Sequence, residues 1–167
     1  EMEPWKNLSV ENKKTIEKER IERARRENFG FKKAEILEGN IGYLDFHIFD
    51  RSDSALETGS AALNFLANSE AVILDLRANR GGHPRMVQMV ASCFIEGRTH
   101  INTIVDRNGK VQEEIWTLPL FPGRTMYDRD LYILTGPRTA SAAESFAYIM
   151  KNLSRADLVG ECTAGAA

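Results

Sequence analysis

The sequence has few of the residues that mark a disulfide scaffold or a metal site. Its 167 residues include two cysteines, Cys93 and Cys162, which lie far apart and form no C-x-x-C pair. The three histidines are scattered, and none has a second ligand-type residue at helical spacing. A disulfide framework and a structural zinc site are therefore not expected, and no metal or other cofactor is predicted.

An excess of charge and long apolar runs are also missing. The 22 Lys and Arg against 24 Asp and Glu give a net charge of −2, so no positive field favours nucleic acid or acidic membranes. No apolar run approaches the ~20 residues that span a bilayer. The phosphate-binding spacings G-x-x-x-x-G-K-[ST] and G-x-G-x-x-G are absent, and so is the hydrolase elbow G-x-S-x-G. We therefore expect neither a nucleic-acid partner nor a membrane span.

Patterns of alternating strands and helices predict an α/β domain. Lys33–Phe49 indicates a hairpin around a Gly39–Asn40 turn, and Ile101–Val105 with Val111–Trp116 indicates a second hairpin. Ala71–Arg77 is a continuous apolar run, typical of a strand buried on both faces. The other predicted elements are a helix over 54–69 capped by Asp53 or Ser54, helices over 84–94 and 142–153, and strands over 131–134 and 158–161.

The first part of the chain differs in composition from the rest. Glu11–Asn28 alternates Lys, Arg and Glu with few apolar residues, which predicts a solvated helix. We interpret residues 1–30 as a charged helical connector and residues 31–167 as the functional core, incomplete at its C-terminal end. A docking role for this helix stays open, whereas its interleaved glutamates argue against a nucleic-acid arm.

Two predicted strands each run into a turn and then a helix. The segments are ILDLRANRGGHP and YILTGPRTASAAES, and parallel neighbouring strands would bring both turns to one edge of the sheet. Gly81 and Gly82 allow close approach of the backbone, and the N–H of Ala142 at a helix start has no helical partner. These N–H groups could hold the negative oxygen of a tetrahedral intermediate beside the Ser141 hydroxyl.

Ser141 has a second interpretation that needs no catalysis. Ser141-Ala-Ala-Glu144 precedes an apolar run and has the pattern of a capping box. The two interpretations are compatible, because a cap can also fix the backbone of a nucleophile. For His83, next to the glycines, the alternatives are a general base and a surface residue of the turn.

The motifs resemble a known family. AVILDLRANRGG is similar to the D-[LV]-R-x-N-x-G-G segment of the tail-specific, or C-terminal processing, serine proteases. YILTGPRTASAAESFAYIMKNLSRADLVGECTAG resembles their nucleophile segment, and RRENFGFKKAEILEGNIGYLDF extends the likeness over most of the chain. The bacterial branch that resembles the modules of interphotoreceptor retinoid-binding protein is the most similar.

The resemblance implies a fold and an activity. The fold would be a ClpP/crotonase-like α/β core of β-β-α units, here truncated. The activity would be hydrolysis of peptide bonds in a peptide or protein substrate through an acyl-enzyme on Ser141. The oxyanion hole would use Gly81 or Gly82 with the amide of Ala142. Because relatives are often exported, the periplasm or the cell surface is favoured.

One position departs from the family pattern. The processing proteases place a lysine base in a T-x-G-K segment, where this chain has Thr163-Ala164-Gly165-Ala166. A serine hydroxyl is a weak nucleophile without a base. Three explanations stay open: a base outside residues 1–167, His83 as the base, or an inactive module that binds hydrophobic ligands or peptides. We favour the first, and we expect residues 1–167 alone to turn over peptides slowly or not at all.

Overall fold

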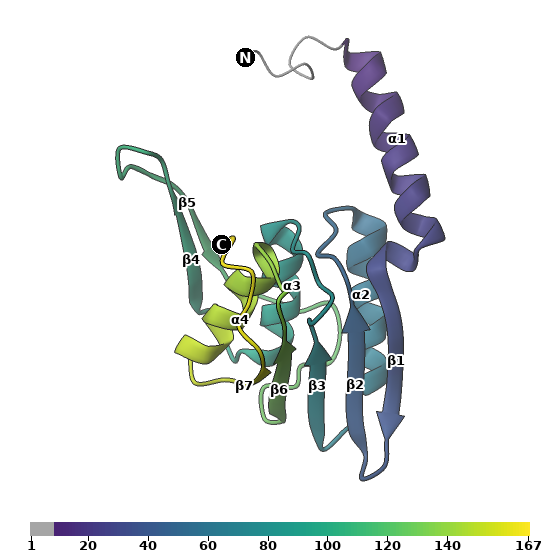
Figure 1. Cartoon of the computed structure of the whole chain (residues 1–167), viewed down its shortest axis with the longest axis vertical. Coiled ribbons are helices and arrows are strands. Elements are labelled where there is room, and N and C mark those ends of the chain that lie inside the picture. The colour runs from purple at the N-terminus through teal and green to yellow at the C-terminus, as the bar shows by residue number, and fades with distance from the viewer. Residues whose placement is uncertain (1–8) are drawn as a thin grey trace.

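The computed structural model describes residues 9–167, which form one mixed sheet with helices and a separate hairpin. The five-stranded sheet has the order β1-β2-β3-β6-β7 (Figure 1). β1 pairs antiparallel with β2, and β2, β3, β6 and β7 are mutually parallel. The predicted α/β class is thus confirmed. The strands are β1 Phe31–Leu37, β2 Ile41–Phe46, β3 Ala71–Asp75, β6 Asp130–Thr135 and β7 Asp157–Gly160.

Three helices follow the strands and begin at recognisable caps. α2, Asp53–Leu66, follows β2; α3, Pro84–Phe94, follows β3; and α4, Ala142–Asn152, follows β6. The prediction for the cap of α2 was wrong: Ser52, rather than Asp53 or Ser54, accepts the hydrogen bond from the Ala55 N–H. α3 starts at a proline, whose missing N–H costs nothing at that position.

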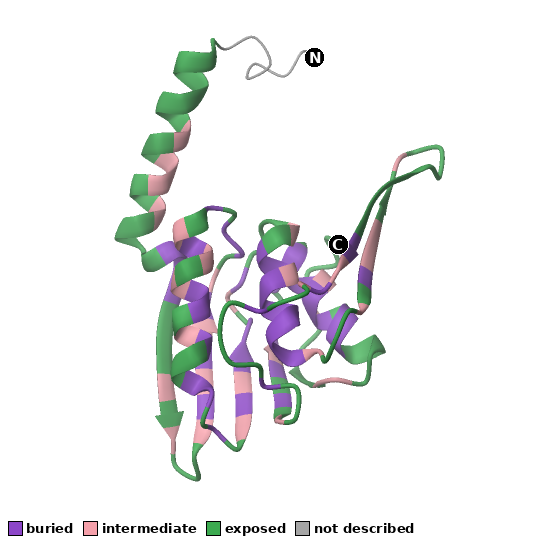
Figure 2. Cartoon of the chain, turned by 180° about the vertical axis from the view of Figure 1, so that it is seen from behind, coloured by how far each residue is buried: buried purple, intermediate pink, exposed green. Residues whose placement is uncertain are grey.

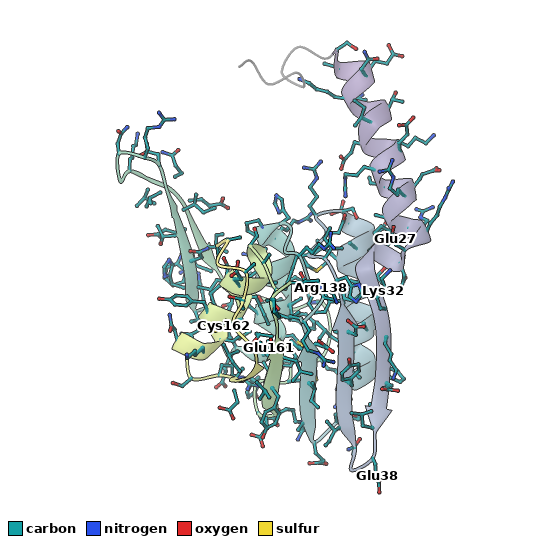
Figure 3. All side chains as sticks on the ribbon, in the orientation of Figure 1. Glu27, Lys32, Glu38, Arg138, Glu161 and Cys162 are labelled. Carbon is teal, nitrogen blue, oxygen red and sulfur yellow. The ribbon has the colours of Figure 1, made fainter. Side chains whose placement is uncertain are left out.

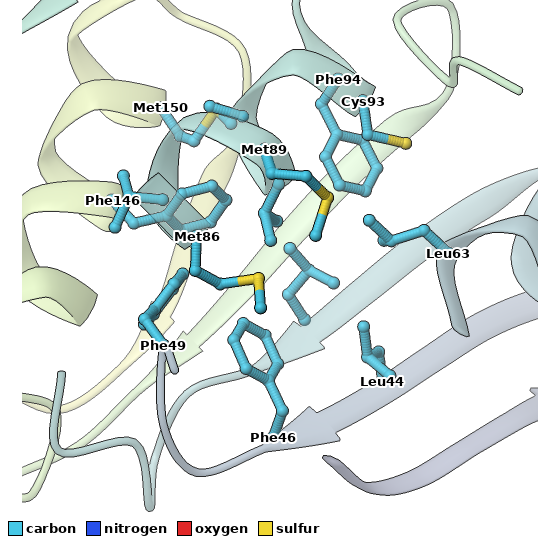
Figure 4. Packing of buried hydrophobic residues seen from close by; sticks show 14 of the residues in the cluster. Leu44, Phe46, Phe49, Leu63, Met86, Met89, Cys93, Phe94, Phe146 and Met150 are labelled. Carbon is cyan, nitrogen blue, oxygen red and sulfur yellow. The ribbon is translucent and has the colours of Figure 1, made fainter. Parts of the chain in front are cut away.

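The core lies between one face of the sheet and these helices (Figure 2). Phe46, Phe49 and Phe146 join β2, the loop after it and α4, with Phe46 and Phe49 edge to face at 4.9 Å between ring centroids (Figure 4). β3 was expected to be buried on both faces, but Ile73 is only half-buried while Leu74 is fully buried. The reason is that α2, α3 and α4 cover only one face, so burial alternates along the strand.

Two elements project from this body (Figure 1). The first is α1, Val10–Arg26, which has no buried residue and is attached at its C-terminal end. A three-residue 3₁₀ turn, η2 (Asn28–Gly30), joins it to β1. The second is the hairpin of β4, His100–Val105, and β5, Val111–Trp116. The sequence predicted both elements to within two residues at each end.

The last strand leads into a short exposed segment. Glu161 and Cys162 lie on it (Figure 3), and Cys162 is exposed whereas Cys93 is buried in α3. Burial raises the pKa of the Cys93 thiol to about 12. Among the helices of residues 9–167, none combines the length and the apolar character needed to cross a bilayer.

Candidate active site

The two predicted turns lie at the same edge of the sheet. β3 and β6 are parallel neighbours, with Asp75 in register with Leu134, so their carboxyl ends lie side by side. The turn after β3 contains Gly81 and Gly82, and the turn after β6 contains Ser141. The side chain of Thr139 joins the turns, because its hydroxyl donates to the Leu76 carbonyl at 2.8 Å.

Asn79 organises the glycine turn from a fully buried position. Its Nδ2 donates to the Phe46 carbonyl at 2.9 Å, and its Oδ1 accepts from the Gly81 N–H at 2.9 Å. Its carbonyl accepts from the N–H of Ala140, one residue before Ser141, at 3.1 Å. One residue therefore ties the end of β2, the glycine turn and the serine turn together.

Gly81 is in direct contact with the serine turn. A Cβ at Gly81 would lie 2.8 Å from the Ser141 Cβ and 2.9 Å from the Ala142 nitrogen. Its φ of +91° is also in the region that side-chain-bearing residues avoid. Only glycine therefore fits here, and the structure brings the Gly81–Gly82 and Ser141–Ala142 segments together.

Ser141 precedes the first turn of α4 and is exposed. Its φ of 51° with ψ of −122° is unusual for a residue other than glycine, and such conformations persist only when neighbouring structure holds them. The capping box expected from the sequence is present, and the Ser141 N–H donates to the Glu144 carboxylate at 2.7 Å. The cap thus fixes the backbone of the exposed serine.

Glu144 also holds the segment that follows β7. Its carboxylate accepts from the N–H of Gly165 and, at 2.9 Å, from the N–H of Ala166. Burial raises the pKa of Glu144, but the hydrogen bonds from Thr163, Ala166, Gly165 and Ser141 outweigh it, so the net pKa is lowered. Ser141 and Ala166 donate to the same oxygen, Oε2, so position 166 lies close to the serine backbone.

Two N–H groups in this region have no acceptor within residues 9–167. They belong to Gly82, which is exposed, and to Ala142, the first residue of α4. The Gly81 N–H, by contrast, already donates to Asn79. Of the three predicted donors, Gly82 and Ala142 are therefore the ones free to bind an incoming oxygen, and the Ala142 N–H lies at the positive end of the α4 dipole.

His83 lies beside Gly82 but is engaged as a cap. Its Nδ1 accepts from the Arg85 N–H at 3.2 Å at the start of α3, and the ring is exposed. Within the described part of the chain, no hydrogen bond joins His83 or any acidic or basic side chain to the Ser141 hydroxyl. Residues 9–167 also contain no group of three or more His, Cys, Asp or Glu side chains that could hold a metal ion.

Cavities flank the two turns. A cavity of about 320 Å³ lies on the α1 side, lined by Gly82 and His83 together with Arg20, Ile48 and Arg51 among others. A smaller cavity of about 30 Å³ lies between α3, α4 and the hairpin, with Ala142 in its wall. The exposed Gly82 and Ser141 thus sit in a surface that is hollowed on two sides.

Sequence reasoning missed three contributors to this region. Asn79 lies in the segment AVILDLRANRGG, but nothing in the sequence predicted a role for it. Its buried side-chain amide bonds to Phe46 and Gly81, which are adjacent to it only in the folded chain. Glu144 was predicted as half of a capping box, but its bonds to Gly165 and Ala166 join residues over 20 positions apart. The wall formed by Ile101 and Ile115 depends on where the hairpin docks, which no local pattern encodes.

Comparisons with known proteins agree on one family. The sequence model described as peptidase family S41 matches residues 40–167. A carboxyl-terminal-processing protease of Synechocystis sp. is 34% identical over 128 residues, which is 75% of this chain and 28% of the relative. The chain thus spans little more than a quarter of the length of that relative.

Solved structures share the fold. A photosystem II D1 C-terminal processing protease has a TM-score of 0.63 at 22% identity, over 82% of this chain and 35% of the other. A lipoprotein from Streptococcus agalactiae has a TM-score of 0.67 at 22% identity, over 87% of this chain and 55% of the other.

Proposed function

The chain belongs to peptidase family S41, and from this premise we propose that it is a serine-type peptidase with Ser141 as the nucleophile. The observation that supports the proposal is the contact between Gly81 and the backbone of Ser141 and Ala142, because Ser141 is exposed and the N–H groups of Gly82 and Ala142 have no acceptor within residues 9–167. A peptide or protein is the substrate class.

The chemistry follows acyl transfer. The Ser141 Oγ attacks the carbonyl carbon of the scissile peptide bond, and its proton passes to a base. The N–H groups of Gly82 and Ala142 donate to the oxygen that gains charge, and each such donor is worth about 3 kcal/mol. The C–N bond then breaks, the amine leaves with a proton, and water hydrolyses the acyl-enzyme to regenerate the hydroxyl.

The mechanism requires a base that accepts the proton of the Ser141 hydroxyl. His83 adjoins the proposed oxyanion donors, but its Nδ1 accepts from the Arg85 N–H, so the neutral ring carries its proton on Nε2. His83 could therefore take the Ser141 proton only at Nδ1, after release of the bond from Arg85. Position 166, which corresponds to the family lysine, is an alanine that cannot act as a base. We therefore expect low turnover from residues 1–167.

A fluorophosphonate probe tests the proposal, because it reacts with activated serines. We expect labelling of the full-length protein and no labelling of its Ser141→Ala variant, with Ser54→Ala on α2 as the control that labels normally. Equal labelling of the chain and of Ser141→Ala would rule out Ser141 as the nucleophile. His83→Asn keeps a good helix cap and removes the ring, so a loss of labelling there would identify His83 as the base.

A second candidate function is favoured by the alanine at position 166. Without a base bonded to Ser141, the same surface would act as a module that binds peptides or hydrophobic ligands and does not cleave them. This alternative predicts no covalent adduct with the probe. It also predicts a thermal stabilisation that saturates with added peptide, fatty acid or retinoid.

A further inference from the structure

We infer that the free edge of β1 pairs with β1 of a second copy of this chain, so that two five-stranded sheets join into one continuous sheet. The two copies are related by a two-fold axis perpendicular to the sheet, so each contact is made twice. This inference goes beyond the proposed peptidase activity and does not depend on it, because β1 supplies no residue of the candidate site.

β1 is an edge strand that pairs with β2 alone (Figure 1). Its other edge therefore presents N–H and C=O groups that point away from β2. Within residues 9–167, the further hydrogen bonds to main-chain groups of β1 are confined to Phe31 at its start, through Asn28. The edge from Lys32 to Leu37 is open, and such an edge is a template for another strand.

The charges on β1 match those of a second, antiparallel β1. Lys33 and Glu35 lie on the face of the sheet away from the helices. Their neighbours in register on β2, Asp45 and Tyr43, lie on the same face. In a pair centred on Ala34, Lys33 of each copy stands opposite Glu35 of the other, so two ion pairs form by symmetry. Opposite charges in directly facing positions stabilise an antiparallel pair of strands.

The same two charges disfavour the neighbouring registers. Pairing centred on Lys33 would place two ammonium groups opposite each other, and pairing centred on Glu35 would do the same for two carboxylates. In the single chain, Lys33 and Glu35 pair with each other at 2.5 Å. Their side chains remain 55% and 33% exposed, so both can turn toward a facing strand. The charge pattern therefore favours the register centred on Ala34, whereas an edge protected by lysines alone would repel a second copy.

The helix side of β1 adds apolar surface to this pairing. Ala34 and Ile36 lie on that side, because Leu44, the neighbour of Ala34 on β2, is buried in the core. Ala34 is exposed, and its small side chain would lie on the two-fold axis. Ile36 is 43% exposed and would face Lys32 of the second copy, whose aliphatic stem can cover it. Pairing thus removes from water an apolar side chain that the single chain exposes.

Sedimentation equilibrium of the chain at several concentrations tests the inference, and we expect a dimer that dissociates on dilution. Lys33→Glu and Glu35→Lys should each weaken the dimer about tenfold, because each places like charges opposite each other at two symmetric positions. The double variant Lys33→Glu/Glu35→Lys should restore the dimer, since opposite charges face each other again. Lys110→Glu and Glu113→Lys make the same changes in charge on the exposed β4–β5 hairpin and should dimerise like the wild type.

A cross-link checks the register. In a Cys162→Ser background, which removes the exposed native thiol, Ala34→Cys should be joined to its symmetry mate by a short bis-maleimide. Ile36→Cys should not, because its symmetry mate lies four residues away along the strand. A chain that is monomeric at every concentration, a dimer that both single charge variants leave intact, or a double variant that fails to restore the dimer overturns the inference. Fluorophosphonate labelling of Ser141 decides the proposed function separately.

Discussion

At the scale of single residues, the candidate site depends on Gly81 having no side chain. The hypothetical Cβ of Gly81 would approach the Ala140 carbonyl oxygen to 2.5 Å, well inside contact distance. Backbone atoms cannot rotate away as a side chain can. The close approach of the two turns is therefore possible only with glycine at this position.

Gly81→Ala should lower the free energy of unfolding by more than about 2 kcal/mol, since strain at positive φ and a backbone clash add together. Labelling of Ser141 should fall with it. Gly109→Ala is the matched control, because Gly109 has φ +79° but open space around it, so only the conformational cost of about 1–2 kcal/mol applies. Denaturant unfolding measures both, and equal losses would contradict the clash.

Position 166 is the second residue on which the proposed function depends. Its N–H and that of Ser141 bond to one oxygen of Glu144, so the serine and position 166 are held close together. The geometry thus keeps the arrangement in which a long basic side chain at 166 could reach the serine hydroxyl.

Ala166→Lys should therefore raise the Ser141-dependent cleavage rate at least tenfold, because a placed general base contributes about 10²–10⁴-fold. The rate should rise with pH as the lysine loses its proton. Ala167→Lys adds the same charge one residue further on and serves as the control. If both variants, or neither, gained activity in a peptide-hydrolysis assay, position 166 would not be the site of the base.

Sequence reasoning pointed to Ser141, Ala142 and the two glycines, and the structure brings Gly81 against the backbone of Ser141 and Ala142. Long-range partners were not predictable, because a hydrogen bond such as that from Asn79 to the Phe46 carbonyl joins residues 33 positions apart. Such bonds depend on the assembled sheet, whereas turns and caps depend on a few neighbouring residues.

At the scale of elements, α1 is joined to the body by ion pairs near its C-terminal half. Arg20 pairs with Asp50 in the loop after β2, and Glu17 pairs with Arg51 at 2.7 Å. Ile21 and Ala24 add limited apolar contact to the core. Asp50 is buried, whereas the Glu17–Arg51 pair is exposed and is therefore weak and screened by salt. Because α1 itself has no buried residue, it should be the first helix to loosen.

Acid should release α1. Hydrogen bonds from Arg20 and then Arg51 lower the pKa of Glu17 from 4.5 to about 2. A lowered folded-state pKa means that this contribution is complete above about pH 4.5 and is lost as the pH falls toward 2. NMR relaxation of the α1 amides should therefore show greater mobility at pH 3 than at pH 6.

Two variants check this assignment. Glu17→Gln should show the greater mobility already at pH 6, with a smaller further change in acid. Glu22→Gln, on the same helix and without an ion pair among the described residues, should behave like the wild type. Acid-induced mobility that persisted unchanged in Glu17→Gln would mean that another group controls the attachment.

Most elements were predictable from the sequence, because turn residues, caps and apolar periodicity act locally. The prediction of α3 matched at both ends, since Pro84 starts the helix and an apolar face runs to Phe94. The prediction for β3 failed in its burial, because a continuous apolar run does not show how many helical layers surround a sheet. The position of the β4–β5 hairpin over α3 and α4 was likewise not encoded in its own residues.

At the scale of the whole molecule, one face of the sheet carries all three strand-linked helices and the other is less covered. Tyr43, Ile73 and Tyr132 lie in register across that second face, and each retains solvent exposure. At the carboxyl end of β3, Asp75 accepts a hydrogen bond from the Tyr43 hydroxyl at 2.7 Å and forms an ion pair with Arg77.

The separation of the two turns along the chain has a consequence for biosynthesis. Gly81 leaves the ribosome about 60 residues before Ser141, which at about 5–20 residues per second is a delay of several seconds. During that interval β6 does not yet exist to align beside β3. A nascent or truncated polypeptide that stops short of this pairing cannot bring the serine to the glycines, so the candidate site is not assembled until translation has passed the central sheet.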